Sequence, residues 1–214
     1  IFFDLFFKIC SNKKFICEKW LAKCQEWKKN YPIVKREFYR QKNFVNPYVF
    51  IHELSKQLPK NSITIADDGG HLTWAIQAFK VKMGQKLFSA FGNSPMGYAF
   101  PASIGASIVT KKGKIVCIDG DGSIQINIQE LQTVVANRLP IKIIIFNNNG
   151  YGIIKQFQEL YLGSRYEASG KGVTNPNFEK VSKAYGINYH RIINHKNLYK
   201  ILRKVLRSNR AEFL

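Results

Sequence analysis

The sequence predicts an α/β protein in which a parallel sheet carries helices on both faces. Uninterrupted apolar segments such as Lys114 to Asp119 and Ile141 to Phe146 alternate with helical segments. Strands that are apolar throughout are typical of sheets covered on both faces. Apolar residues make up 45% of the 214 residues, which is enough for a substantial core. Glycine-rich turns follow several of the predicted strands, where such sheets bind their ligands.

Residues 1–44 are expected to be organised differently from the rest. Residues 1–30 predict a short strand followed by one or two helices, and residues 31–44 predict a polar, basic linker. The main domain is expected over residues 45–214. Its first helix should begin at Asn46-Pro47, because Asn caps a helix and Pro suits its first turn, and Pro59 should end it.

Beyond residue 60, strands and helices are expected to alternate. Strands are predicted at 63–66, 87–90, 114–119, 141–146 and 188–192, and at the end of the chain. Helices are predicted at 74–79, 97–109, 127–139, 153–160, 178–185 and 197–208. The chain begins in apolar, strand-like sequence and stops where a strand would start. It is therefore expected to be a piece of a longer protein, truncated at both ends.

Charge, hydropathy and cysteine content exclude several classes of protein. The net charge is +19, but the lysines are scattered along helices without a nucleic-acid-binding motif, so no nucleic-acid partner is expected. No run of 18 apolar residues is present, so no membrane span is expected. Cys10, Cys17 and Cys24 recur every seven residues, which predicts one face of a helix, and Cys117 lies in an apolar strand. Reduced, buried thiols predict a cytoplasmic protein.

Two polar turns carry the strongest functional signal. Gly120-Asp121-Gly122-Ser123 follows one apolar strand, and Asn147-Asn148 follows the next, 27 residues after Asp121. A carboxylate and an amide at the ends of two such strands can converge on one hard cation, and Mg²⁺ prefers oxygen ligands. The turn glycines let backbone N–H groups approach a phosphate near a helix N-terminus. The pattern predicts a site for a magnesium-bridged diphosphate.

The order of these motifs resembles that of thiamine diphosphate enzymes. The resemblance rests on GDGS, on Gln129-Glu130-Leu131, on Leu139-Pro140 and on NNNGYG at 147–152. It covers about residues 45–214 and is to the pyrophosphate-binding, C-terminal domain of the acetolactate synthase-like family. It implies the thiamine diphosphate-binding fold, and residues 1–30 resemble the tail of the family's central domain.

The resemblance implies roles for residues that match the family motif. Asp121, the side chain of Asn148 and the carbonyl of Gly150 would hold Mg²⁺. The diphosphate would be surrounded by Gly120, Gly122, Ser123, Tyr151 and Gly152. His71 would contact the diphosphate, although a histidine at the surface of a helix N-terminus is the alternative. Gly70 stands where the family often has Gln, so that contact would be lost or made by the backbone.

A second segment resembles the part of the family that holds the aminopyrimidine ring. Met96 falls at the position of the apolar residue that bends the cofactor, and the Ser94 carbonyl would accept a hydrogen bond from the 4′-amino group. The alternative for Met96 is an ordinary core residue. Asp67-Asp68 could imitate a metal site, but a loop of turn-forming acids is the expected interpretation.

The resemblance implies decarboxylation and carboligation of a 2-oxo acid. The alternatives are a simple 2-oxo-acid decarboxylase, a sugar-linked acyl transfer, and an inactive truncated product or partner subunit. No catalytic residue is assigned, because the family's activating glutamate lies on a pyrimidine-binding domain, in cis or on another chain. A homodimer or tetramer is expected. FAD is left open, because in acetolactate synthases it lies mostly on the central domain. Phe157 occupies a substrate-pocket position at which those enzymes usually carry Trp.

Overall fold

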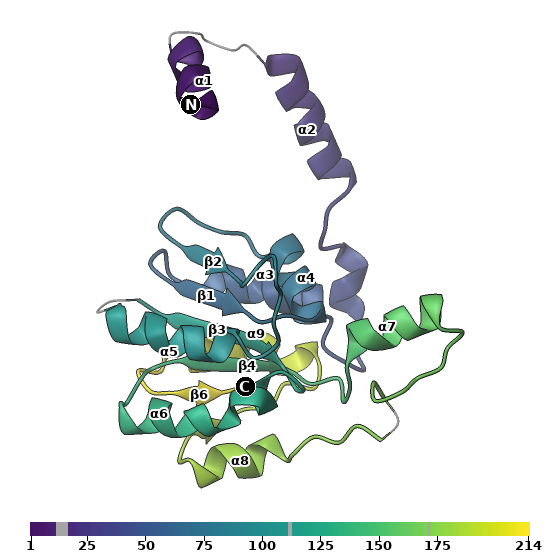
Figure 1. Cartoon of the computed structure of the whole chain (residues 1–214), viewed down its shortest axis with the longest axis vertical. Helices are drawn as coiled ribbons and strands as arrows, with labels where there is room; N and C mark the ends of the chain where they lie inside the picture. The colour runs from purple at the N-terminus through teal and green to yellow at the C-terminus, as the bar shows by residue number, and fades with distance from the viewer. Residues whose placement is uncertain (12–16, 111–112, 171) are drawn as a thin grey trace. The chain divides into compact units, whose positions relative to one another are not determined.

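The computed structural model describes residues 1–11, 17–110, 113–170 and 172–214, and they divide into two compact units (Figure 1). Residues Ile1–Ile33 form the first unit and Val34–Leu214 the second. The helices are α1 (Phe2–Cys10), α2 (Glu18–Asn30), α3 (Pro47–Gln57), α4 (Gly70–Ala78), α5 (Ala99–Val109), α6 (Leu131–Ala136), α7 (Gly152–Tyr161), α8 (Phe178–Ala184) and α9 (Leu198–Arg207). Short 3₁₀ helices lie at Arg36–Arg40, Ile124–Glu130 and His195–Asn197. The strands are β1 (Ile63–Ala66), β2 (Lys86–Phe88), β3 (Ile115–Gly120), β4 (Lys142–Phe146), β5 (Asn188–Tyr189) and β6 (Glu212–Phe213).

The first unit is helical, so the strand predicted near the N-terminus is wrong. The segment forms α1, with Asp4 in the first turn and Lys8 in the last, where both charges favour the helix dipole. A short apolar run without alternation fits a helix as well as a strand, so the apolar pattern alone could not distinguish the two. In α2, the rings of Trp20 and Trp27 meet edge to face with centroids 5.6 Å apart.

The cysteines of this unit also depart from expectation. Cys10 ends α1, Cys17 precedes the first residue of α2, and Cys24 lies within α2, so the three do not share one helix. Residues 12–16, between them, lie outside the described part of the chain. Of the four thiols only that of Cys117 is buried. The cytoplasmic location inferred from the cysteines stays a prediction.

The second unit contains the predicted parallel sheet. Six strands run in the order β2-β1-β3-β4-β6-β5, and every neighbouring pair is parallel. The chain leaves β1 toward β2 at one edge and returns to β3 on the other side. The gap between the carboxyl ends of β1 and β3 is thus a topological switch point, where open α/β sheets place their ligands.

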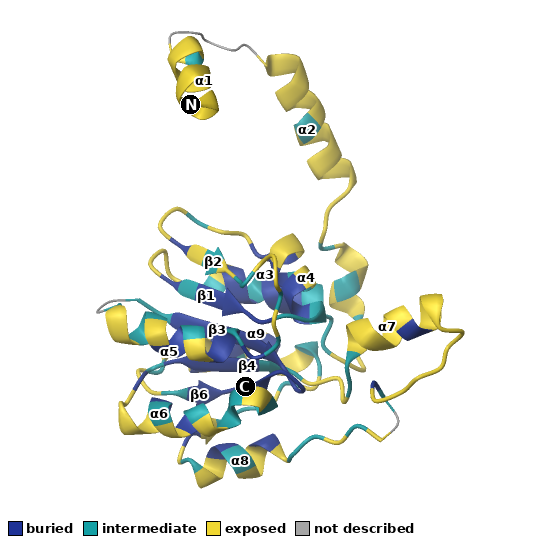
Figure 2. Cartoon of the chain, viewed as in Figure 1, coloured by how far each residue is buried: buried dark blue, intermediate teal, exposed yellow. Residues whose placement is uncertain are grey.

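Successive side chains of the strands point to opposite faces of the sheet and pack into two separate hydrophobic cores. Val116 and Ile118 of β3 pack with α3, α4 and α9 on one face. Ile115 and Cys117 pack with α5, α6 and α8 on the other face. Figure 2 shows the buried strands between helices whose outer sides are exposed. The helices on both faces confirm the predicted fold class.

One local sequence signal is confirmed and one helix boundary differs. The Asn46 side chain accepts hydrogen bonds from the backbone N–H groups of Tyr48 and Val49, so it caps α3 as predicted. The helix expected over 127–139 instead begins as a 3₁₀ turn at Ile124, and Asn127 has non-helical backbone angles. Its amide donates to the Gly97 carbonyl at 2.5 Å, which ties this segment to the loop before α5.

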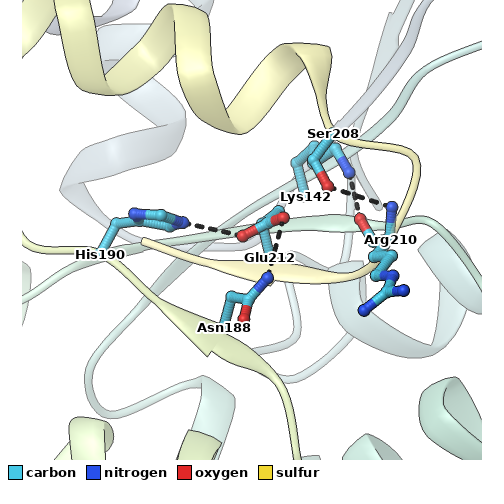
Figure 3. A network of polar contacts seen from close by, with 6 residues as sticks. All are labelled: Lys142, Asn188, His190, Ser208, Arg210 and Glu212. Atoms are coloured by element: carbon cyan, nitrogen blue, oxygen red, sulfur yellow. Dashed lines mark hydrogen bonds and ion pairs between the residues drawn. The ribbon is translucent and has the colours of Figure 1, made fainter.

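A buried polar network holds the last strands of the sheet together (Figure 3). Glu212 of β6 pairs with His190 at 2.8 Å and accepts from Asn188 of β5 at 3.3 Å. The neighbouring Lys142 of β4 donates to the carbonyl of Arg210, and burial lowers the pKa of this lysine to about 8.

In the part of the chain that the structure describes, no helix is long and apolar enough to cross a membrane.

Candidate functional site

A cavity of about 860 Å³ opens at the carboxyl ends of β1, β3 and β4. This volume lies within the range of small-molecule and cofactor sites. The loops after all three strands line it, so the topology brings together segments that are distant in sequence. Its wall includes every predicted site residue except Ser94 and Phe157. Those in the wall are Gly70, His71, Met96, Gly120, Asp121, Gly122, Ser123, Asn148, Gly150, Tyr151 and Gly152.

Three polar groups converge in this cavity. The Asn148 amide lies between Oδ1 of Asp121 and the carbonyl oxygen of Gly150, and in its hydrogen-bonded orientation its NH₂ group donates to them at 3.3 and 2.6 Å. Turning the amide over directs its oxygen toward the same two atoms, which offers three oxygens to a cation. Oxygens that bind one Mg²⁺ at right angles lie about 3.0 Å apart, since each is about 2.1 Å from the ion. The two contacts bracket that value, so the residues fit a hard cation.

Asp121 itself is held from several sides. Its side chain is buried, Oδ1 accepts from the Gly122 N–H at 3.0 Å, and Oδ2 accepts from the Gly150 N–H at 3.3 Å. Oδ2 also accepts from the Asn175 amide at 2.6 Å. Gln125 donates both to Oδ1 of Asn175 and to the Asp121 carbonyl. Sequence reasoning missed Asn175 and Gln125, because neither belongs to a recognisable motif.

Two glycines in these loops are required by close approach. A Cβ atom on Gly122 would lie 2.3 Å from Cε1 of Tyr151, and one on Gly150 would lie 2.7 Å from the carbonyl oxygen of Ser169. Tyr151 also donates its N–H to that carbonyl at 3.0 Å. The ring of Tyr151 therefore covers the Gly120–Ser123 turn, and any side chain on either glycine would move it or the loop.

His71 lies in the floor of the cavity rather than at a helix surface. It is 5% exposed, and a Cβ atom on Gly69 or Gly120 would lie within 3.0 Å of its ring. Its ring stacks with Phe146 at a centroid distance of 6.4 Å. Burial lowers the pKa of His71 to about 4, so the imidazole is neutral near pH 7. None of the described residues offers Nε2 a hydrogen bond, which leaves this nitrogen for a ligand.

Asp67, His71 and Asp119 form a second group whose polar atoms lie within 4.8 Å of one another. Both oxygens of Asp67 are already used, because they accept from the N–H groups of Gly97 and Ala99 at 2.8 and 2.7 Å. Burial, and then the charge of Asp67, raises the pKa of Asp119 well above its usual range. The raised pKa of Asp119 disfavours its charged form, and the oxygens of Asp67 already accept backbone N–H groups, so this group is a poor magnesium site. Asp67 instead holds the start of α5.

The remaining predicted residues lie in different surroundings. Met96 is half-buried and lines the cavity. Ser94 has a left-handed backbone, with φ of 43°, and its N–H donates to Ala90. Phe157 lies on α7 and is 53% exposed, with its ring 4.8 Å from that of Tyr161. The structure therefore does not bring Ser94 or Phe157 into the wall of the cavity.

The fold and the site together define a class of protein. A parallel sheet with glycine-rich turns, a buried carboxylate and a cofactor-sized cavity at its switch point is typical of enzymes that bind a phosphorylated cofactor. The profile described as "Thiamine pyrophosphate enzyme, C-terminal TPP binding domain" matches residues 67–214. The chain belongs to this family. Thiamine pyrophosphate is another name for thiamine diphosphate, so the match confirms the predicted cofactor class.

The curated relatives agree with this assignment. The chain is 36% identical over 183 residues to "Acetolactate synthase large subunit" of Pyropia yezoensis, covering 86% of this chain and 30% of the relative. It is 32% identical over 203 residues to "Probable acetolactate synthase large subunit" of Methanocaldococcus jannaschii, covering 92% and 34%. These matches confirm the acetolactate synthase-like resemblance. The chain spans about a third of the length of these relatives.

Proposed function

We propose that this chain supplies the diphosphate- and magnesium-binding half of an enzyme that decarboxylates a 2-oxo acid and joins the product to an acceptor. Thiamine diphosphate supplies the electron sink for the electron pair released on decarboxylation. The relatives named acetolactate synthase support this choice of reaction. The observation that carries the proposal is the convergence of the Asp121 carboxylate, the Asn148 amide and the Gly150 carbonyl in a cofactor-sized cavity.

The chain's own residues would bind and orient the cofactor. Asp121, Asn148 and Gly150 would hold Mg²⁺ against the diphosphate, and Ser123 and nearby N–H groups would receive phosphate oxygens. Nε2 of His71 faces no described protein partner and would contact the diphosphate. An apolar wall that includes Trp74, Phe146, Met96, Ile153 and Ile154 would keep water from the reacting carbon.

A partner domain is part of the proposal. Among the described residues, those lining the cavity include Asp68 and Asp121 but no glutamate. The activating glutamate would therefore come from a pyrimidine-binding domain, in cis or on a second chain. A homodimer or tetramer would place that domain over the cavity. The chain without such a domain should bind the cofactor but not turn over substrate.

Calorimetric titration with thiamine diphosphate and Mg²⁺ tests the binding half of the proposal. Asp121→Asn should abolish magnesium-dependent binding, because it removes the charged ligand and turns an NH₂ group toward the cation or toward Asn175. Glu159→Gln makes the same change of charge on an exposed position of α7 and should bind like the wild type. Unchanged affinity in Asp121→Asn, or wild-type binding that ignores Mg²⁺, would exclude the assigned metal site.

Product analysis tests the catalytic half. The chain combined with its pyrimidine-binding domain, thiamine diphosphate, Mg²⁺ and pyruvate should form acetolactate, detected by NMR, and Asp121→Asn should form none. If the cofactor binds and pyruvate remains untouched, pyruvate is not the donor, and the other 2-oxo-acid or sugar-linked reactions replace it.

A further inference from the structure

The two carboxylate oxygens of Asp121 face different surroundings. Oδ1 lies beside the amide of Asn148 and accepts the Gly122 N–H at 3.0 Å. Oδ2 accepts the Asn175 amide at 2.6 Å and the Gly150 N–H at 3.3 Å. The shorter contact, from Asn175, is the stronger constraint on Oδ2. Oδ1 accepts one backbone donor and keeps a lone pair for a cation, while Oδ2 has both of its lone pairs occupied by hydrogen-bond donors.

Asn175 is itself fixed in one orientation. Its Oδ1 accepts from Nε2 of Gln125 at 2.9 Å, and the same Nε2 donates to the Asp121 carbonyl at 2.8 Å. If the Asn175 amide turned over, its oxygen would face the Asp121 carboxylate and its NH₂ group would face Gln125. Both contacts would then be repulsive. Gln125 therefore ensures that Asn175 presents a donor to Asp121.

The number of free carboxylate oxygens decides which cation a site prefers. Mg²⁺ demands a nearly ideal octahedron at about 2.1 Å, in which a carboxylate contributes one oxygen. Ca²⁺ takes about six to eight ligands at longer distances and accepts a carboxylate through both oxygens. A hydrogen-bond donor on the second oxygen therefore weakens the binding of Ca²⁺ through both oxygens. It leaves the binding of Mg²⁺ through one oxygen intact.

We propose that Asn175 is a positioning residue that holds Asp121 to one-oxygen coordination and thereby sets the preference of the site for Mg²⁺ over Ca²⁺. The inference rests on the proposed metal site and adds to it the basis of cation choice. Asn175 touches neither the cation nor the cofactor in this account. It acts only through the carboxylate that it orients.

The test compares Asn175→Leu with Asn177→Leu in the full chain. Leucine has nearly the shape of asparagine and leaves little room for a water molecule that could replace the amide. Asn177 lies two residues away and caps α8 by accepting from the Lys180 N–H at 3.0 Å, so its loss reports a purely structural effect. Mg²⁺ and Ca²⁺ are titrated separately at saturating thiamine diphosphate. Trp74, which lines the cavity, gives the fluorescence signal in a Trp20→Phe, Trp27→Phe background.

We expect Asn175→Leu to lose about tenfold in Mg²⁺ affinity, the usual effect of removing an outer hydrogen-bond partner. Its Ca²⁺ affinity should fall much less, so the ratio of the two affinities shifts toward Ca²⁺. Asn177→Leu should keep the wild-type ratio even where its thermal unfolding midpoint falls. Gln125→Met should shift the ratio in the same direction as Asn175→Leu, because it frees the amide to turn. If Asn175→Leu fails to fold, Gln125→Met still tests whether the Asn175 amide sets the cation preference.

The outcomes separate this inference from the proposed function. Equal losses for both cations, or an unchanged ratio, would overturn the role of Asn175 while leaving the metal site in place. A wild-type chain that binds thiamine diphosphate without any dependence on Mg²⁺ or Ca²⁺ would instead overturn the proposed function. A shift toward Ca²⁺ confined to the Asn175 and Gln125 variants supports the inference.

Discussion

At the scale of single residues, His71 shows how burial sets the chemistry of the site. Its pKa is lowered to about 4 by burial, whereas an exposed histidine titrates near 6.5. The unfolded chain therefore binds a proton at this residue between about pH 6.5 and 4, and the folded chain does not. The stability that comes from burying the neutral ring is present above pH 6.5 and is lost as the pH falls toward 4.

The expected loss on acidification is large enough to measure. Lowering the pKa of His71 from 6.5 to about 4 corresponds to about 3 kcal/mol of unfolding free energy between pH 7 and pH 4. Urea unfolding of the cofactor-free chain at both pH values should show this loss. In His71→Gln the contribution of this residue should vanish, so the dependence on pH becomes shallower by that amount. If the unfolding free energy changes equally with pH in the wild type and in His71→Gln, His71 is not buried in its neutral form.

Asp121 and its neighbours mark the limit of sequence reasoning at this scale. Strand-turn motifs identified Asp121 and Asn148, because each follows directly on an apolar strand. Asn175 could not be predicted, since it lies 54 residues from Asp121 in a loop without a periodic pattern. Gln125 lies four residues from Asp121, but it belongs to no recognisable motif. Which oxygen of a carboxylate is already occupied is a property of the folded loops. It leaves no mark on the local sequence.

At the scale of elements, the fully buried Asp67 connects the end of β1 to the start of α5. Its carboxylate accepts the N–H of Ala99, the first residue of α5, and that of Gly97 in the preceding loop. Charge-assisted bonds of this kind are stronger than neutral ones. Gly97 requires φ of +86° in this loop, which favours glycine. Asp67 therefore fixes the path of the segment that carries Met96 into the cavity.

Replacing Asp67 tests that role. Asp67→Asn keeps the shape but turns an NH₂ group toward one of the two backbone donors, so the free energy of unfolding should fall by about 2 to 3 kcal/mol. Asp68→Asn removes a half-buried carboxylate one residue later and should cost much less. The comparison uses denaturant unfolding at pH 7 for both variants. Similar stabilities for the two would count against Asp67 as the residue that holds the start of α5.

The elements themselves were predictable where strong local signals agree. Apolar strands at β1, β3 and β4, and the Asn46-Pro47 helix start, combine composition with capping chemistry. The N-terminal segment failed because aromatic and aliphatic residues in a short run suit a helix and a strand alike, and only the Asp4 and Lys8 positions favoured the helix. Asn127, where a helix was expected to begin, has non-helical backbone angles and donates its amide to the Gly97 carbonyl, a tertiary contact that local propensity does not encode.

At the scale of the whole molecule, both hydrophobic cores and the walls of the cavity belong to the unit that spans Val34–Leu214. The cofactor half of the site can therefore be judged from this unit alone. The exposed apolar side chains of α7, among them Phe157 and Leu160, lie on a helix whose first residues line the cavity. A pyrimidine-binding domain set against the cavity would be the natural partner for that helix in the proposed enzyme.

The most direct test of the account is a crystal structure of the chain with thiamine diphosphate and Mn²⁺, using the anomalous signal of manganese. We expect one strong peak bounded by Oδ1 of Asp121, the side-chain oxygen of Asn148 and the carbonyl of Gly150, with the diphosphate beside it. A peak at the Asp67, His71 and Asp119 cluster, or a bound diphosphate without any metal peak, would contradict it.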